Sequence, residues 1–160
     1  MIARCSAGSR SKVAMRRRKG NLPRVSPAPP VRVEPERTLD GVLGFEVLEM
    51  GEDRARGRVE VADRIRQPLG LVHGGVFAAL AESITSATTF RAVSGEGMVA
   101  VGQSNHTSFL RPVLEGTVHA DARRRHRGRT SWVWEVDFSD DGGRLCALSR
   151  VTLAVRPARP

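Results

Sequence analysis

The stretch from residue 67 to residue 91, QPLGLVHGGVFAALAESITSATTFR, decides how this sequence folds. Within it Val76, Leu80 and Ile84 recur every four residues, which is the spacing of one apolar face on an α-helix. Such a face has to be buried against other parts of the chain. The sequence therefore predicts one long helix from about His73 to Arg91.

Alternating patterns on both sides of this helix predict β-strands. Two short strands precede it, at residues 45–50 and 55–61. Four follow it, separated by turns that contain glycine, at residues 98–113, 117–125, 130–139 and 144–155. Two strands, a long helix and a meander of four strands predict an α+β fold with an antiparallel sheet.

The net charge of +9 is concentrated in the first part of the sequence. Residues 1–37 hold ten Lys and Arg against two Glu, whereas residues 38–160 hold the other 16 Lys and Arg against 15 Asp and Glu. Residues 1–37 are rich in Pro, Ser and Arg without apolar periodicity, which predicts a disordered basic leader before one domain at residues 38–160. Because that domain is nearly neutral and the leader has no aromatic residue, nucleic-acid binding is not expected.

Cysteine content and hydropathy indicate the compartment. The two cysteines, Cys5 and Cys146, have no neighbours at the spacing of a metal site or a disulfide framework. The sequence has no run of about 20 apolar residues, which a membrane-spanning helix requires. We therefore expect a cytoplasmic protein without a membrane span or a bound metal.

Glu82 is the one acidic residue between Gln67 and Phe90. The residues three and four positions away along the helix cannot form an ion pair with it. It lies opposite the apolar stripe, on a face shared with the small residues Gly75, Ala78, Ala79, Ser86 and Thr89. A lone carboxylate on such a face is either solvated or placed for use above an open surface.

The segment His73-Gly74-Gly75 stands where the helix is expected to begin. The first N–H groups of a helix lack helical acceptors, and adjacent glycines let another molecule approach them closely. These donors favour an anion or a polarised carbonyl oxygen. The same residues are also typical of a tight turn into a helix, with His73 as its cap.

Residues 123–129, RRRHRGR, contain five arginines in seven positions. Alternate residues of a strand share a face, so Arg123, Arg125 and Arg127 are predicted to converge on one anion. A solvated charged face is the alternative interpretation.

Three segments resemble the hotdog-fold acyl-CoA thioesterases: residues 67–83 (QPLGLVHGGVFAALAES), 105–112 (NHTSFLRP) and 126–130 (HRGRT). The likeness is closest to the group that contains the hydroxybenzoyl-CoA and phenylacetate-pathway thioesterases, and it covers roughly residues 38–155. It implies a hotdog fold, in which an antiparallel sheet of five to six strands wraps one long central helix.

By position, the resemblance implies that Glu82 is the catalytic carboxylate, acting as nucleophile or general base. It implies that the Gly74 N–H polarises the thioester carbonyl, and that Gln67, supplied across a subunit interface, helps to position the thioester or water. Ser86 stands where relatives often have a hydroxyl residue, for which Thr85 is an alternative. With the helix start included, the expected catalytic set is Glu82, Gly74, Gln67, His73 and Ser86.

The resemblance also places the turn at residues 127–130 near coenzyme A, whose phosphates suit guanidinium groups. The expected substrate- and CoA-binding set is Gly75, Arg127, Gly128, Arg129, Thr130 and Arg111. No cofactor is expected, because coenzyme A enters as part of the substrate, and a homodimer or homotetramer is implied. The implied reaction is hydrolysis of an acyl- or aryl-CoA to a carboxylate and free coenzyme A. The alternative is a non-catalytic acyl-CoA-binding module on the same fold.

Overall fold

The computed structural model describes residues 33–158. Of the predicted basic leader (residues 1–37), residues 1–32 lie outside the described part of the chain. The last residues of that leader form one turn of 3-10 helix, η1 (Pro35–Arg37), and the short helix α1 (Leu39–Leu43) follows. Thr38 caps α1, as its side-chain oxygen accepts a hydrogen bond from the Gly41 N–H at 3.2 Å.

The long helix predicted from the apolar spacing is α2 (Gly74–Val93), and the prediction is confirmed. Its stripe of Val76, Leu80 and Ile84 is buried. The 3-10 turn η2 (Asp63–Ile65) precedes the helix, and the 3-10 turn η3 (Ser94–Glu96) follows it. None of the helices in the described part is long and apolar enough to cross a membrane.

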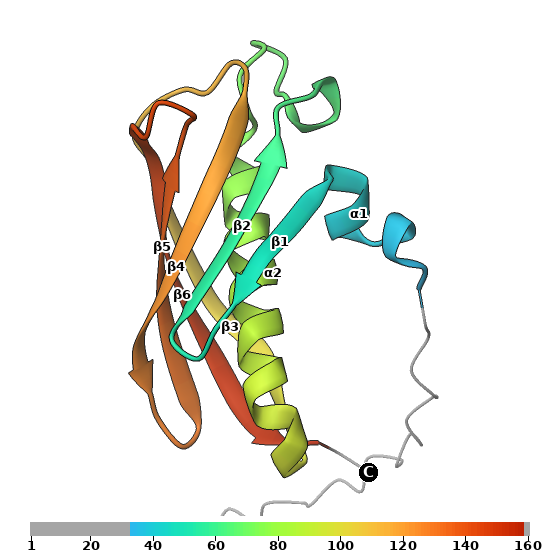
Figure 1. Ribbon diagram of the computed structural model, residues 1–160, viewed down its shortest axis with the longest axis vertical. Coiled ribbons are helices and arrows are strands. Elements are labelled where there is room, and N and C mark those ends of the chain that lie inside the picture. The colour runs from blue at the N-terminus through green and yellow to red at the C-terminus, as the bar shows by residue number, and fades with distance from the viewer. Residues whose placement is uncertain (1–32, 159–160) are drawn as a thin grey trace, which may run out of the picture. The chain divides into compact units, whose positions relative to one another are not determined.

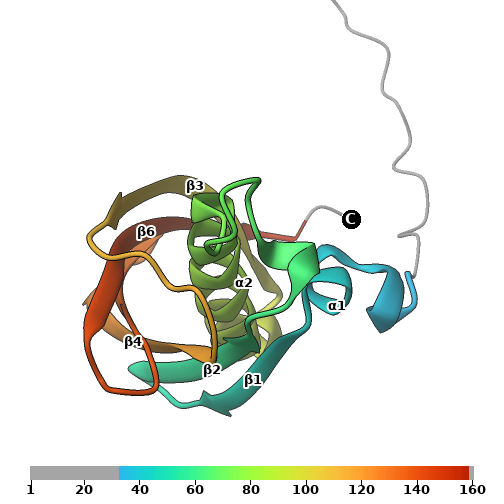
Figure 2. The same ribbon diagram turned by 90° about the horizontal axis from the view of Figure 1, so that it is seen from above.

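Six antiparallel strands form one sheet that curves around α2 (Figures 1 and 2). The strands are β1 (Phe45–Met50), β2 (Arg54–Glu60), β3 (Met98–Phe109), β4 (Thr117–Arg127), β5 (Ser131–Ser139) and β6 (Leu145–Pro157). Their order in the sheet is β1-β2-β4-β5-β6-β3. The predicted α+β architecture, with one central helix and five to six antiparallel strands, is confirmed.

The four strands after the helix do not form the meander expected from the sequence. β4, β5 and β6 are successive neighbours, but β3 pairs with β6 along its length, from Met98 opposite Pro157 to Phe109 opposite Ala147. Because β2 pairs with β4, the remaining place for β3 is the free edge of β6. The chain then crosses from β3 to β4 through residues 110–116, and β3 becomes an edge strand.

The core lies between α2 and the concave face of the sheet. Trp134 and Phe138 of β5 are fully buried there, and Phe138 meets the ring of Phe77 edge-on at 5.3 Å between centroids. The Trp134 indole N–H donates to the Thr89 hydroxyl at 3.0 Å. Burying one large apolar side chain contributes about 1.5–3 kcal/mol, so this contact fixes α2 firmly across the sheet.

Candidate active site

Glu82 lies halfway along α2, on the side of the helix that faces β3. Its side chain is exposed, and a Cβ atom added to Gly102 of β3 would collide with its carboxylate oxygen. One turn earlier, the Ala78 carbonyl accepts a hydrogen bond from the Asn105 amide at 2.9 Å, which holds β3 against the helix. Among residues 33–158, the carboxylate of Glu82 has no hydrogen-bond or ion-pair partner, so the expected lone carboxylate is present.

The face around Glu82 is less open than the sequence suggested. Thr89 was expected to share this open face, but its side chain is fully buried and receives the Trp134 indole N–H. The prediction for Thr89 is therefore wrong, because the large indole of β5 reaches the last turns of α2. The open part of the face ends near Ser86, which is half-buried.

The structure separates the two hydroxyl candidates near Glu82. The Thr85 hydroxyl is buried and donates to the Ala81 carbonyl at 2.7 Å, within the helix. The Ser86 hydroxyl has no protein partner in the described part of the chain. Ser86 is therefore the hydroxyl free to contact a ligand.

His73 caps the start of α2, the alternative that the sequence left open. Its Nδ1 atom accepts a hydrogen bond from the Gly75 N–H at 2.9 Å. His73 and Gly75 both line a cavity of about 310 Å³ beside α1, which does not include Gly74. The cap thus occupies the Gly75 N–H, while the Gly74 N–H has no acceptor among the described residues.

Gly74 opens onto a different cavity, of about 460 Å³, which Gln67 also lines. Its apolar walls include Phe77 and Phe109, whose ring centroids are 6.1 Å apart, and Arg111 also lines it. A Cβ on Gly74 would lie 2.9 Å from the Phe109 ring, so the absence of a side chain allows this close packing. The structure therefore brings a free N–H, an amide side chain and an apolar wall together.

Glu82 does not line this cavity. It follows Gly74 by eight positions, which corresponds to roughly 12 Å along the helix axis at 1.5 Å per residue. One copy of α2 therefore does not bring the Gly74 N–H and the Glu82 carboxylate to the same carbonyl group.

The arginines of β4 do not converge as predicted. The register of β4 against β5 shifts between Arg124 and His126, so the alternation of faces is interrupted at this bulge. From the two sides of this bulge, Arg124 and Arg127 both stack over the Trp132 ring, at 4.7 and 5.1 Å from its centroid. The bulge thus puts these two arginines, rather than alternate ones, on one aromatic ring.

Separate carboxylates neutralise the arginines that were expected to bind one anion. The ion pairs are Arg123–Asp121 at 3.7 Å, Arg125–Glu135 at 2.6 Å and Arg127–Glu52 at 3.1 Å. Hydrogen bonds from Arg150 and Arg125 lower the pKa of Glu135. The alternative reading, a charged surface, holds for this part of the run.

The turn after β4 lines a third cavity, of about 850 Å³. Arg129 and Thr130 line it together with Gln103 and Arg156, which the sequence analysis did not single out. Neither Arg129 nor Arg156 forms an ion pair within the described part of the chain. Arg156 comes from β6, and only the pairing of β5 with β6 brings it to this turn.

Gly128 holds the turn in place. Its N–H donates to the Ser131 carbonyl at 2.9 Å, and its own carbonyl accepts the Trp132 indole N–H at 3.1 Å. A side chain at Gly128 would crowd the His126 ring. Gly128 therefore shapes the turn that presents Arg129 to the cavity.

Comparison with known proteins identifies the family. The family model described as the thioesterase superfamily matches residues 69–147. Rv1847 of Mycobacterium tuberculosis is 38% identical over 137 residues, which are 84% of this chain and 98% of that protein. The chain belongs to the thioesterase superfamily.

Two further relatives support the assignment of this chain to the thioesterase superfamily. The 1,4-dihydroxy-2-naphthoyl-CoA hydrolase of Escherichia coli is 35% identical over 120 residues, covering 75% of this chain and 88% of the relative. A crystal structure of a variant of thioesterase PA1618 from Pseudomonas aeruginosa matches with a TM-score of 0.74 and 31% identity, over 78% of this chain and 89% of that one. The hotdog fold and the assignment to the thioester hydrolases are confirmed.

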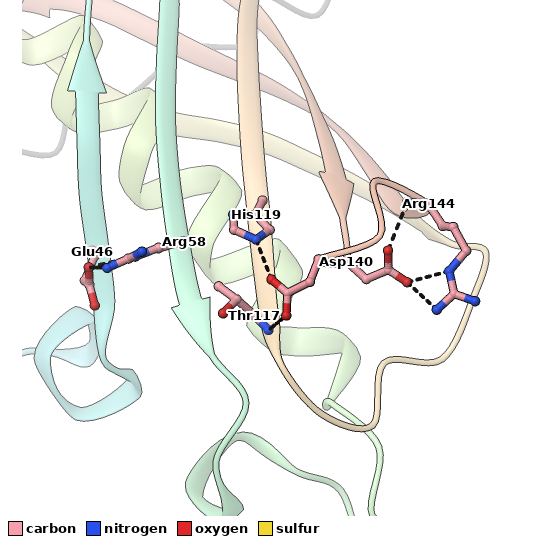
Figure 3. A network of polar contacts seen from close by, with 7 residues as sticks. Glu46, Arg58, Thr117, His119, Asp140 and Arg144 are labelled. Carbon is pink, nitrogen blue, oxygen red and sulfur yellow. Dashed lines mark hydrogen bonds and ion pairs between the residues drawn. The ribbon is translucent and has the colours of Figure 1, made fainter.

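Charged side chains at the other end of the thioesterase sheet pair among themselves (Figure 3). His119 of β4 binds Asp141 at 2.8 Å, and this hydrogen bond, with one from the Thr117 N–H, lowers the pKa of Asp141. Arg144 binds Asp140 at 2.7 Å. The two bonds to Asp141 fasten the β5–β6 turn to β4, and the Arg144–Asp140 pair lies within that turn. None of these residues belongs to the expected site. No group of three or more His, Cys, Asp or Glu side chains within residues 33–158 could hold a metal ion.

Proposed function

We propose that this protein hydrolyses the thioester bond of an acyl- or aryl-coenzyme A, giving a carboxylate and free coenzyme A. The observation that carries the proposal is the pair of unused groups in α2: the Gly74 N–H, which opens onto an apolar cavity beside Gln67, and the unpaired Glu82 carboxylate. Membership of the thioesterase superfamily supports the same reaction.

The reaction requires both groups at one carbonyl, so we infer that two copies of the chain build each site. β3 is an exposed edge strand, in which Val101 is 52% and Phe109 is 59% exposed. Two such edges paired antiparallel about a two-fold axis near Asn105 bring Gly102 of one subunit beside Phe109 of the other. Because Glu82 lies over Gly102 and Gly74 packs on Phe109, this pairing closes the gap along the helix.

Gln67 reaches Glu82 across the interface in this arrangement, as the resemblance implies, and Gly74 comes from the same subunit as Gln67. The partner's cavity near Met98 and Gln103 then lies next to the cavity at Gly74. A homodimer is the smallest assembly that provides the complete site.

The chemistry follows from these positions. The Gly74 N–H donates to the carbonyl oxygen, where negative charge develops, and one such donor contributes about 3–4 kcal/mol to transition-state stabilisation. Glu82 either takes a proton from the attacking water or attacks the carbonyl carbon itself to form an anhydride that water then opens. In both routes the carbon–sulfur bond breaks and the coenzyme A thiolate leaves. Gln67 and Ser86 hydrogen-bond the thioester or water.

The coenzyme A end of the substrate is assigned to the cavity of about 850 Å³. Arg129 and Arg156 are free to bind phosphate oxygens there, and Thr130 offers a hydroxyl. Arg127 is engaged with Glu52 and Trp132, so it supports the turn. No further cofactor takes part in this reaction.

Two substitutions at Gly74 test the proposal. Proline at the first position of a helix removes the N–H but fits the backbone, and His73 before it is already extended (φ −66°, ψ 132°). We expect Gly74→Pro to lower kcat by about 10²–10³, and Gly74→Ala, which keeps the N–H, to lower it far less. The measurement is thiol release from short-, medium- and long-chain and aryl acyl-CoAs.

An unchanged kcat in Gly74→Pro would overturn the role of this N–H. Binding of acyl-CoA by the wild type without thiol release from any member of the panel would favour the non-catalytic acyl-CoA-binding module instead. Turnover by the wild type also identifies the acyl groups that the site accepts.

A further inference from the structure

Phe109 is the last residue of β3, and its ring is packed on one side only. The ring lies 2.9 Å from the Cβ position of Gly74 and 6.1 Å, between centroids, from the ring of Phe77. These two contacts fix it against the first turn of α2. Phe109 is nevertheless 59% exposed, and β3 is an edge of the sheet. A fixed aromatic ring at a free edge presents an apolar surface to the strand that pairs with that edge.

β3 turns Phe109 and Gly102 to the same side of the sheet. The Asn105 amide binds a carbonyl of α2 and Phe109 packs on the start of that helix, so both lie on the helix side. The Cβ position of Gly102 meets the carboxylate of Glu82 in α2, so Gly102 also lies there. Strict alternation would put positions 102 and 109 on opposite faces. The register shift between Gly102 and Ser104 restores the common face.

In the antiparallel pairing of two β3 edges, Gly102 comes opposite Phe109 of the partner subunit, on the side of the helices. The Cβ atoms of directly opposite residues lie about 4.5–5.5 Å apart. Because glycine has no side chain, the partner's Phe109 has room to lean across the strand, as aromatic rings opposite glycine do in sheets. The carboxylate of Glu82 lies above Gly102. The ring of one subunit therefore reaches the carboxylate of the other.

The carboxylate of Glu82 is open to solvent in a single chain. It is exposed and has no hydrogen-bond or ion-pair partner among residues 33–158, and its neighbours on the same face of α2, Ala79 and Ser86, are small. An apolar ring on the β3 side removes water from that side and leaves the side toward Ser86 open to substrate. Excluding bulk water strengthens the interaction of a carboxylate with the groups that it does contact.

We propose that Phe109 is a positioning residue that acts across the subunit interface: its ring shields the carboxylate of Glu82 in the other subunit from bulk water. This inference rests on the proposed function for the pairing of the two β3 strands. The ring is held by Gly74 and Phe77 of its own chain, but it serves the carboxylate of the other chain.

Alkylation of a cysteine introduced at position 82 tests this shielding without turnover. Glu82→Cys is prepared alone and combined with Phe109→Ala, Phe109→Leu or Val101→Ala. Val101 is the matched control, since it lies on the same strand and is 52% exposed but points to the opposite face. Mass spectrometry follows the reaction of the introduced thiol with iodoacetamide, separately from the two native cysteines, in samples that sedimentation shows to be dimers.

We expect alkylation to be about tenfold faster with Phe109→Ala, since access and thiolate formation decide the reactivity of a cysteine. Phe109→Leu, which keeps an apolar side chain, should give a smaller increase, and Val101→Ala should leave the rate unchanged. Equal rates with and without Phe109→Ala would overturn the inference. So would an equal increase with Val101→Ala, or a wild type that sediments as a monomer. The comparison with Phe109→Leu decides the question if Phe109→Ala does not dimerise.

Mixed dimers show which subunit supplies the ring. When the Glu82→Cys chain pairs with a Phe109→Ala chain, the introduced thiol lacks the partner's ring, so its alkylation should be fast. When a chain with both Glu82→Cys and Phe109→Ala pairs with the wild type, the partner supplies the ring, so alkylation should be slow. The opposite order of rates would place the ring and the carboxylate in one chain and overturn the inference.

Thiol release from acyl- and aryl-CoAs by the wild type separates this inference from the proposed function. Shielding of position 82 without thiol release would retain the role of Phe109 at the interface and overturn the hydrolase. Thiol release without shielding would do the reverse.

Discussion

The arginine-rich end of β4 and the middle of α2 carry charge in opposite ways. Residues 123–127 of β4 hold four arginines, and each has a carboxylate partner among Asp121, Glu135 and Glu52. α2 holds one acid, Glu82, and it has no partner in residues 33–158. The dense run stabilises the surface, whereas the isolated carboxylate is available for chemistry. The candidate site is therefore marked by a charged side chain without an ion-pair partner, and not by a high density of charge.

The strongest test of this contrast mixes two inactive variants. Glu82→Gln lacks the unpaired carboxylate and Gly74→Pro lacks the free N–H. If the site is shared between subunits, each mixed dimer has one site with both groups intact, and an equal mixture after subunit exchange regains about a quarter of the wild-type rate. Thiol release before and after mixing measures this. Continued inactivity in verified mixed dimers would show that one chain supplies both groups, or that Glu82 is not used.

The position of the unpaired carboxylate is tested by Gly102→Ala. The new methyl group would collide with the carboxylate of Glu82, and a displacement of about 1 Å costs on the order of 10² in rate. We expect kcat to fall by up to that factor while KM changes little. Gly95→Ala is the matched control, since nothing lies within 4 Å of its Cβ position. Equal kcat values for the two variants would contradict the proposed contact.

Free and paired arginines are compared by Arg129→Ala and Arg127→Ala. Arg129 has no carboxylate partner within the described residues and lines the large cavity, so its loss should raise KM for acyl-CoA about tenfold. Arg127 is paired with Glu52, so its loss should leave KM nearly unchanged. Neither variant should affect a pantetheine thioester that lacks the nucleotide. A larger KM effect for Arg127 would reverse the assignment.

The smallest effect concerns a paired acid, Asp121. Hydrogen bonding from Arg54 lowers the pKa of this carboxyl in the folded protein. Its stabilising contribution is therefore present above the unfolded pKa of about 3.9 and is lost as the pH falls through the lower folded pKa. We expect Asp121→Asn to cost roughly 1 kcal/mol or less at pH 7. Urea unfolding measures the difference in the free energy of unfolding between the wild type and Asp121→Asn. This difference should be smaller near pH 2 than at pH 7, and an equal difference at both pH values would contradict the prediction.

Local sequence patterns predicted where the helix and the strands lie, but not which strands pair with each other. The spacing of Val76, Leu80 and Ile84 and the alternation of the strands are properties of neighbouring residues, so α2 and all six strands could be located. The place of β3 depends on which strand edge remains free, which no local pattern encodes. For the same reason the sequence could not bring Arg156 to the turn at Arg129.

The candidate site shows the same division. That Glu82 has no partner along the helix is visible in the sequence, because it depends only on residues three and four positions away. The convergence of Arg123, Arg125 and Arg127 failed because one extra residue at the β-bulge reverses the alternation of faces. The contact of Glu82 with Gly102 joins positions 20 apart and needs the placement of β3 against α2.

That contact also links two positions in evolution. A side chain at position 102 displaces the carboxylate at position 82 only while that side chain is as long as glutamate. With aspartate there, one methylene shorter, the carboxylate withdraws from β3 and this contact no longer opposes a methyl group at position 102. Substitutions at the two positions are therefore epistatic: Gly102→Ala is harmful in the present background and becomes tolerable after Glu82→Asp, so the order in which the two changes arise decides whether the path stays functional.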